Sequence, residues 1–312
     1  MARSIPTTPG LACRTRRIKL TKTLAGHAAL IALGCVFFTP FAWLVTTSLQ
    51  PDKDRSQITP AFIPVPKSVA DHLNQAADRR NEPHRVYSPT LEHYRKGLTR
   101  VPVLAFLRNT LLICVLSMIG AVLSSSLVAY GFSILRWRGR DAIFFAMLAT
   151  MMLPGQVTMV PVFAIWRQLN LVNTLGPLVI PSFFGVPFFI FLFRQFFLTI
   201  PRELVEAARM DGAGELRIWL RLVMPLSLPV IATVGLFSFL GAWNDFLGPL
   251  IYLADEDQYT LSLGLAMFRT QYGSEYGQML AVATLMVVPI IILFFFTQKT
   301  FIQGIKTSGL KG

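Results

Sequence analysis

The sequence predicts an all-α membrane protein with six transmembrane helices. Of its 312 residues, 53% are hydrophobic and only 14% are charged, whereas a soluble domain carries about 25% charged residues. Apolar stretches of about 20 residues, the length that crosses the hydrocarbon core, recur along the chain. The net charge of +13 is concentrated in the segments between alternate stretches. This composition disfavours a soluble globular protein, and three cysteines exclude a disulfide-stapled module.

Six stretches qualify, or nearly qualify, as membrane spans. They run approximately over residues 24–47, 103–135, 142–166, 177–197, 226–253 and 279–297. The third contains Pro154 and Pro161, and the fourth contains Pro181 and Pro187. Because neighbouring helices must satisfy the carbonyls that such prolines free, we expect a packed bundle. The first span is predicted to be a retained anchor, since it is longer than a signal-peptide core and no A-x-A site follows it.

Basic residues predict that both termini are cytoplasmic. With the N-terminus inside, the inner segments hold 17 of the 29 Lys and Arg residues but only 5 of the 16 acids. The short turn Arg136–Arg140 lies on the same side. This distribution explains the positive charge without nucleic-acid binding. Near the inner end of span four, Arg194 is expected to extend to the membrane interface.

The outer loop Gln50–Arg100 is too short and too polar to bury a core of its own. Short helices are predicted near Val69–Arg79 and Leu91–Leu98. Three of the four histidines fall in this loop: His72, His84 and His93. No two of them have the spacing of metal ligands on a helix, so we expect solvated loop histidines and no metal site.

The inner segment 198–225, which joins spans four and five, is predicted to be helical. Pro201 suits a first helical position, and Glu203 and Glu206 lie where the helix dipole favours acids. Leu204, Ala207 and Ala208 form an apolar stripe.

Asp211-Gly212 ends this helix, and a second short helix is expected over Glu215–Val223, before Pro225. An amphipathic helix lying on the membrane is the alternative reading of the first helix. Its alanines suit close approach of another protein better, because membrane-surface helices use Trp, Phe or Leu.

At this segment the sequence resembles a known family. Residues 206–213 read E-A-A-R-M-D-G-A, similar to the EAA loop of ABC importer permeases, whose form is roughly E-A-A-x-x-D-G-A. The matching positions are Glu206, Ala207, Ala208, Asp211, Gly212 and Ala213. Phe106–Leu111, Met152–Thr158 and Phe193–Phe197 also resemble permease regions of sugar importers.

Two further stretches resemble a narrower class. Trp243–Leu250 is similar to the W-N-x-F-L-x-P-L pattern of the carbohydrate-uptake class, and Gly309–Gly312 resembles the ending of maltose-type and glycerophosphate-type second permeases. The stretch Asp71–Pro89 departs from the family as an insertion in the outer loop.

The resemblance implies a type I ABC importer permease in a bacterial inner membrane. Such a subunit pairs with a second, similar permease, rests on two ATPase subunits and receives substrate from an extracytoplasmic binding protein. The chain is then expected to divide into a basic cytoplasmic tail (1–23), a first transmembrane helix (24–47), an extracytoplasmic loop (48–102), a core permease domain (103–299) containing the coupling loop 198–225, and a cytoplasmic tail (300–312).

The sequence contains no G-x-x-x-x-G-K-[ST] phosphate loop. Energy is therefore expected from another polypeptide, with ATP and Mg on the ATPase subunits and no cofactor, metal or catalytic residue in this chain. Glu206, Ala207, Ala208, Asp211, Gly212 and Ala213 are predicted to couple the chain to the ATPase. Gly212 is expected to make the turn with a positive φ.

Small and polar residues recur on one face of span five. They are Ser238, Gly241, Asn244 or Asp245, and Gly248, and span three shows Thr150, Pro154, Thr158 and Pro161. Such stripes serve helix packing or line a pathway. Because a carboxylate such as Asp245 is costly in a membrane, it favours a site or a paired charge. Trp243, Asn244, Asp245 and Gln156 are the predicted substrate-pathway residues, with an interfacial belt role as the alternative for Trp243.

The predicted cargo is a mono-, di- or oligosaccharide, with a polyol phosphate such as glycerol 3-phosphate, or an amino sugar, as alternatives. An ion-driven secondary transporter would need midplane acids and usually an internal repeat. A membrane enzyme would need paired carboxylates, H-E-x-x-H or a nucleophile elbow. The sequence shows one candidate acid, Asp245, which lies away from the midplane, and no internal repeat. It shows none of the enzyme signatures.

Overall fold

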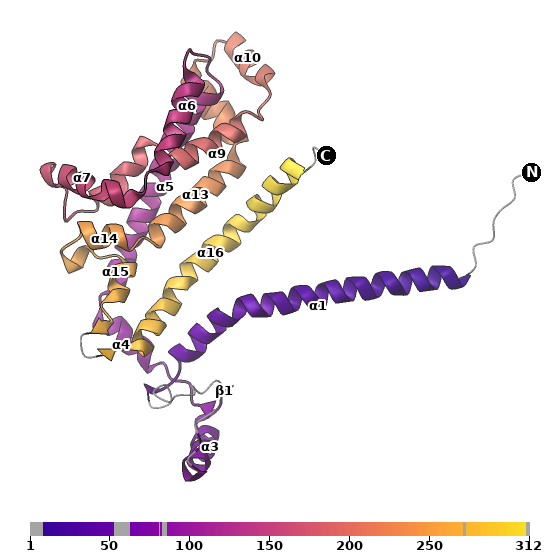
Figure 1. Cartoon of the computed structure of the whole chain (residues 1–312), viewed down its shortest axis with the longest axis vertical. Coiled ribbons are helices and arrows are strands. Elements are labelled where there is room, and N and C mark those ends of the chain that lie inside the picture. The colour runs from indigo at the N-terminus through magenta and orange to yellow at the C-terminus, as the bar shows by residue number, and fades with distance from the viewer. Residues whose placement is uncertain (1–8, 53–62, 81, 83–85, 271–272, 310–312) are drawn as a thin grey trace, which may run out of the picture. The chain divides into compact units, whose positions relative to one another are not determined.

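The computed structural model describes residues 9–52, 63–80, 82, 86–270 and 273–309. The chain forms two compact units, Met1–Tyr94 and Arg95–Gly312, which are described separately. Both are mainly helical (Figure 1).

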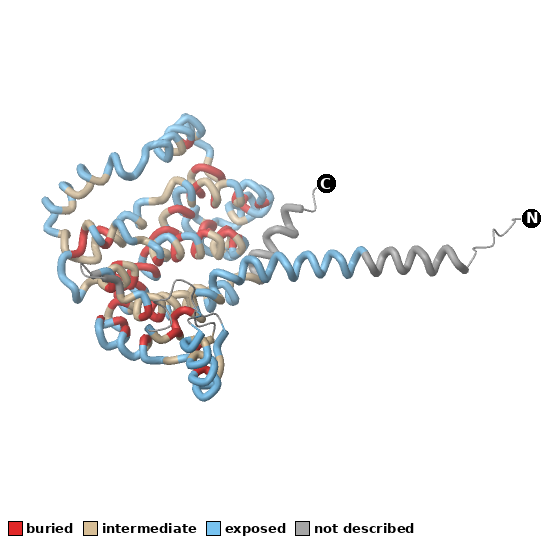
Figure 2. The backbone as a smooth tube through the Cα atoms, turned by 60° about the horizontal axis from the view of Figure 1, so that its bottom comes forward, coloured by how far each residue is buried: buried red, intermediate tan, exposed pale blue. Residues whose placement is uncertain are grey.

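In the first unit, the helix α1 (Pro9–Ser48) contains the predicted first span. Its part Lys22–Ser48 is long and apolar enough to cross a membrane, and none of its most apolar 18-residue window is buried. Figure 2 shows this helix exposed along most of its described length. An apolar helix with an exposed surface suits a lipid environment.

The outer loop contains the two short helices that its sequence predicts. They are α3 (Lys67–Arg80) and α4 (Glu92–Arg100). The strand β1 (Ile63–Pro64), which precedes α3, and the strand β2 (Val86–Tyr87), which precedes α4, form a two-residue parallel pair. His93 is buried, with its Nε2 2.9 Å from the carbonyl oxygen of Gln50, so this histidine holds the loop together and is not solvated as expected. His84 lies outside the described residues.

The second unit is a helical bundle. Its elements are α5 (Val103–Ser133), α6 (Arg140–Ala149), η1 (Thr150–Met152), α7 (Gly155–Gln168), α8 (Gly176–Val179), η2 (Ile180–Phe184), α9 (Pro187–Phe197), α10 (Arg202–Met210), α11 (Glu215–Ile218), η3 (Trp219–Val223), α12 (Met224–Leu226), α13 (Leu228–Trp243), α14 (Leu247–Tyr252), η4 (Glu256–Gln258), α15 (Leu261–Ala266), the hairpin β3 (Arg269–Thr270) and β4 (Gly273–Ser274), and α16 (Tyr276–Gly309).

The long helix α5 is the centre of this bundle and packs against α9 and α13, while α16 packs against α13 (Figure 1). Small residues allow the close packing: a Cβ at Gly120 would lie 2.6 Å from the ring of Phe183. The α5 serines also complete the backbone hydrogen bonding at the break between η2 and α9. Ser124 Oγ accepts from Gly185 N at 3.1 Å, and Ser125 Oγ accepts from Val186 N at 3.1 Å. Such partners make a broken helix tolerable in a membrane.

Among the described residues, four helices are long and apolar enough to span a membrane, and six spans result if each of two bent pairs is one span. The pair α6–η1 and α7 bends by 97° at Leu153-Pro154, within the predicted third span. In the other pair, residues 215–226 meet α13 at 84°, close to the predicted start of span five. The apolar stretch 226–253 is itself broken after Trp243, and α14 follows as a separate helix.

Buried side chains form two apolar clusters. Figure 2 shows the buried residues gathered along the backbone where the helices meet. One lies around the C-terminal half of α5, α9 and the loop helices α10 and α11, and includes Phe193, Val205 and Ile218. The other lies around the N-terminal half of α5, the end of α13, and α15, and includes Phe106 and Trp243.

Candidate functional site

The helix α10 presents one face to the bundle and another to the surroundings. Pro201 immediately precedes the helix, so Arg202 takes the first helical position that the sequence assigns to the proline. Val205 is 3% exposed and packs into the core beside Ala208. Leu204 and Met210 are 44% and 89% exposed. A helix that is anchored on one face and presents exposed apolar side chains beside charged ones on the other is suited to receiving a second protein.

Asp211-Gly212-Ala213 ends α10 in a Schellman motif. Gly212 has φ +77°, as its sequence position predicts. Its N–H donates to Arg209 O, and Ala213 N–H donates to Ala208 O, both at 3.0 Å. These are the two hydrogen bonds that define the motif. Ala213 also packs against the core cluster beside Ala208, so the D-G-A triplet fixes the direction in which the chain leaves the helix.

A polar bridge joins α10 to α11 and to the end of α5. Arg209 Nε donates to Glu215 Oε1 at 2.8 Å and Nη2 donates to Oε2 at 3.3 Å. The hydroxyl of Tyr130, whose residue is 3% exposed, donates to the same carboxylate. The hydrogen bonds from Arg209 hold the pKa of Glu215 below its ordinary value. The coupling loop is thereby tied to the central helix.

The two acids of the predicted coupling set remain free. Glu206 and Asp211 are exposed, and neither side chain has a hydrogen-bond or ion-pair partner within the described residues. Glu206 lines a cleft of about 530 Å³ between α10 and the turn after α5. Both carboxylates are therefore open to basic groups of another chain.

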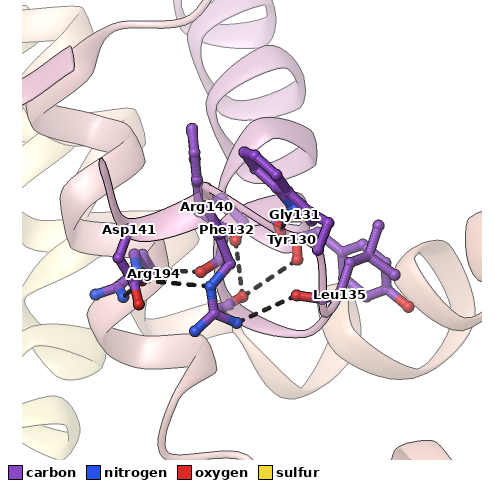
Figure 3. A network of polar contacts seen from close by, with 10 residues as sticks. Tyr130, Gly131, Phe132, Leu135, Arg140, Asp141 and Arg194 are labelled. Carbon is purple, nitrogen blue, oxygen red and sulfur yellow. Dashed lines mark hydrogen bonds and ion pairs between the residues drawn. The ribbon is translucent and has the colours of Figure 1, made fainter. Parts of the chain in front are cut away.

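Arg194 ties three helices together near this loop, as Figure 3 shows. Its Nε donates to Phe132 O and its Nη2 donates to Asp141, both at 3.1 Å. The guanidinium lies 4.2 Å from the centroid of the Phe144 ring. The side chain is only 15% exposed, so partners within the chain hold the guanidinium, and its extension to the interface stays a prediction. The carboxylate of Asp141 and the ring of Phe144, both on α6, hold the Arg194 guanidinium between α5, α6 and α9.

The structure separates the predicted pathway residues into different environments. Trp243 is 2% exposed and stacks on Phe239, with centroids 5.6 Å apart. Asn244 is exposed and donates from Nδ2 to Leu240 O at 2.8 Å. Asp245 Oδ1 accepts from Gly248 N at 3.0 Å, at the start of α14. In this conformation, Trp243 packs in the core, and the Asp245 carboxylate accepts a hydrogen bond from the first turn of α14.

Gln156 is exposed near the start of α7 and has no hydrogen bond to the other three within the described residues. The two regions meet further along, where Phe163 of α7 stacks on Tyr252 of α14 at 6.0 Å. Within this chain, an added Cβ at Gly241 meets nothing within 4 Å. No side chain of the described residues covers the surface near Asn244 and Gly241. A substrate-pathway role for the predicted residues therefore stays a prediction.

Sequence reasoning did not identify the bridge from Tyr130 to Glu215 or the pairing of Arg194 with Asp141. No local pattern marks such contacts, because their members lie 85 and 53 residues apart. The run Ser124–Ser126 inside an apolar span could have indicated a polar contact with another segment, because hydroxyl groups in lipid need hydrogen-bond partners.

The bundle, its apolar spans and the anchored loop helix define a multi-pass membrane protein. Residues 118–307, more than half of the chain, match the family model described as "Binding-protein-dependent transport system inner membrane component". The chain belongs to this family.

Three relatives illustrate its members. The chain is 37% identical over 204 residues to the arabinooligosaccharides transport system permease protein AraQ of Halalkalibacterium halodurans, covering 65% of this chain and 73% of the relative. It is 28% identical to the diacetylchitobiose uptake system permease protein NgcG of Streptomyces coelicolor, covering 88% and 84%. It is 30% identical to the melibiose/raffinose/stachyose import permease protein MelC of Bacillus subtilis, covering 96% and 100%.

A solved structure shares the fold. A chain of a bacterial ABC transporter involved in the import of the acidic polysaccharide alginate matches with a TM-score of 0.69 and 22% identity, covering 96% of this chain and all of the other. The predicted all-α permease fold is therefore confirmed.

Proposed function

We propose that this chain is the permease subunit of an ATP-driven ABC importer for a di- or oligosaccharide in a bacterial inner membrane. It would form half of the pathway with a second permease, rest on two ATPase subunits and accept substrate from an extracytoplasmic binding protein. ATP and Mg would be bound by the ATPase subunits. The relatives AraQ, NgcG and MelC support the sugar class, because all three are named for saccharides of two or more units.

The observation that carries the coupling role is the construction of α10. One face, with Val205 and Ala208, is fixed to the bundle, and the Schellman turn at Gly212 fixes its end. The other face offers Leu204, Ala207 and the free carboxylate of Glu206. Movement of a partner against this exposed face would reach α5 through Tyr130 and α9 through the shared core.

The substrate side of the proposal rests on the exposed amide of Asn244 and the carboxylate of Asp245. Both groups are hydrogen-bonding partners for sugar hydroxyls, and they lie where the chain breaks between α13 and α14. Breaks in membrane helices are common positions for transporter binding sites.

Uptake of radiolabelled sugars by cells lacking this chain tests the proposal. Arabinobiose, diacetylchitobiose, melibiose and raffinose form the panel, and glycerol 3-phosphate represents the alternative cargo class. We expect ATP-dependent uptake of at least one saccharide to be lost on deletion and restored by the wild-type chain. Unchanged uptake of every saccharide, or uptake that follows the proton gradient and ignores ATP, would overturn the proposal.

A further inference from the structure

The cleft beside the coupling loop is basic, and the coupling role does not account for it. It has a volume of about 530 Å³ and lies between the turn after α5, the end of α9 and α10. Arg136, Arg202 and Arg209 line it, together with the single acid Glu206. An adjoining cleft of about 370 Å³ shares Arg136, Trp137 and Arg202.

Two of these arginines are uncommitted. Arg209 is paired with Glu215. Arg136 and Arg202 are exposed, and neither guanidinium has a hydrogen-bond or ion-pair partner within the described residues. Guanidinium groups bind phosphate through parallel hydrogen bonds. The cleft therefore offers two free groups of the kind that recognises a phosphate.

The other wall of the cleft is suited to a lipid. Leu198 and Ile200, at the end of the α9 span, line it next to the arginines. Trp137 stands at the rim, 41% exposed, and its Nε1 donates to Gly131 O at 3.0 Å, which fixes the indole. Tryptophan is enriched where membrane meets water. Apolar and cationic walls side by side match an amphiphile with an anionic head.

We propose that this cleft binds the phosphate of an anionic phospholipid from the leaflet adjacent to the coupling loop. Arg136 and Arg202 bind the headgroup phosphate, Trp137 covers the glycerol region, and the acyl chains extend along the exposed side of Leu198. Basic pockets between membrane helices bind anionic headgroups in this way. Because α10 forms one wall, a bound lipid would fix the position of the coupling helix. The binding itself requires no partner subunit.

Native mass spectrometry of the purified full-length chain, with added phosphatidylglycerol or phosphatidylcholine, tests the proposal. We expect phosphatidylglycerol to be retained and phosphatidylcholine to be lost. Arg136→Gln with Arg202→Gln should weaken phosphatidylglycerol retention by roughly fivefold for each arginine removed. The matched control, Arg138→Gln with Arg217→Gln, removes the same charge outside both clefts and should retain the lipid. Arg136→Lys with Arg202→Lys should restore most of the binding.

Four results would overturn the proposal. Equal retention by the Arg136/Arg202 variant would exclude the cleft as the site, and equal loss in the Arg138/Arg217 control would reduce the effect to general surface charge. Displacement of the lipid by millimolar inorganic phosphate would identify free phosphate as the occupant. Loss of phosphatidylglycerol from the wild-type chain at the same rate as phosphatidylcholine would show that the cleft does not select an anionic lipid. None of these results bears on whether the chain transports a sugar.

Discussion

Replacing Gly212 by valine should uncouple this permease while leaving it inserted. Gly212 has φ +77°, and an added Cβ meets nothing within 4 Å. The penalty is therefore backbone strain and not a clash. Left-handed backbone costs an ordinary residue about 1–2 kcal/mol, and a β-branched residue is less suited to it still. The Schellman hydrogen bonds require this φ. We therefore expect valine to lower the population of the native loop conformation, relative to other loop conformations, by a factor of about 10 to 30.

Two variants of the same loop separate strain from bulk. Gly212→Asn should keep transport, because asparagine is tolerated at left-handed helix ends. Gly214→Val places the same side chain at φ −70° and ψ 157°, where its Cβ also meets nothing within 4 Å. This second variant should keep transport, with only the modest loss of loop stability that valine causes at the N-cap of α11.

The assay reconstitutes the co-purified complex in proteoliposomes and measures ATP hydrolysis and sugar uptake on the same sample. We expect Gly212→Val to insert at the wild-type level and to lose uptake per ATP hydrolysed at least tenfold. Full transport by Gly212→Val would refute the reasoning. Equal damage in Gly214→Val would show that bulk anywhere in the loop, and not the left-handed turn, is responsible.

Three further predictions concern the contacts around the loop. Tyr130→Phe removes the hydroxyl that donates to the part-exposed Glu215. It should destabilise the loop by about 1 kcal/mol, measured as faster tryptic cleavage at Arg209 with unchanged membrane insertion. Unchanged cleavage would contradict a stabilising role for this bridge. Asp141→Asn removes the counter-charge of Arg194. Because Asp141 is 59% exposed, the expected loss of stability is about 1–2 kcal/mol, smaller than for a fully buried pair, and it should lower the melting temperature in detergent. An unchanged melting temperature would show that Phe132 and Phe144 are enough to hold Arg194. Glu215 has a lowered pKa, so its contribution to the stability of the loop should be complete above the ordinary carboxyl pKa of about 4.3 and disappear as the pH falls through the lowered value. The rate of loop proteolysis should therefore stay constant from pH 8 to 5. A change in this rate near pH 7 would contradict the assignment to Glu215.

The features that the sequence predicts well depend on short-range patterns. Apolar length alone locates the four candidate spans that are not sharply bent. The D-G step at the end of an acidic, alanine-containing helix predicts the positive φ of Gly212. Turn chemistry of this kind is local, because it follows from which residues tolerate left-handed backbone.

Other features depend on contacts between distant segments. The apolar stretch 226–253 contains Asn244 and Asp245 directly after Trp243, but these two polar residues do not by themselves show that the helix ends there. That break is supported by Gly248 N–H bonding to Asp245 and by Ser262 bonding to Asp245 O at 2.6 Å. The position of Arg194 likewise depends on Asp141, a residue of another helix.

Site-specific crosslinking from Ala207 tests the central claim most directly. Ala207 lies on the exposed face of α10, where a photoreactive residue causes little disturbance to the bundle. In intact cells we predict a crosslink to an ATP-hydrolysing partner, with a yield that changes when ATP is trapped in the complex. Labelling confined to membrane lipid, or to proteins on the outer side of the membrane, would contradict the account.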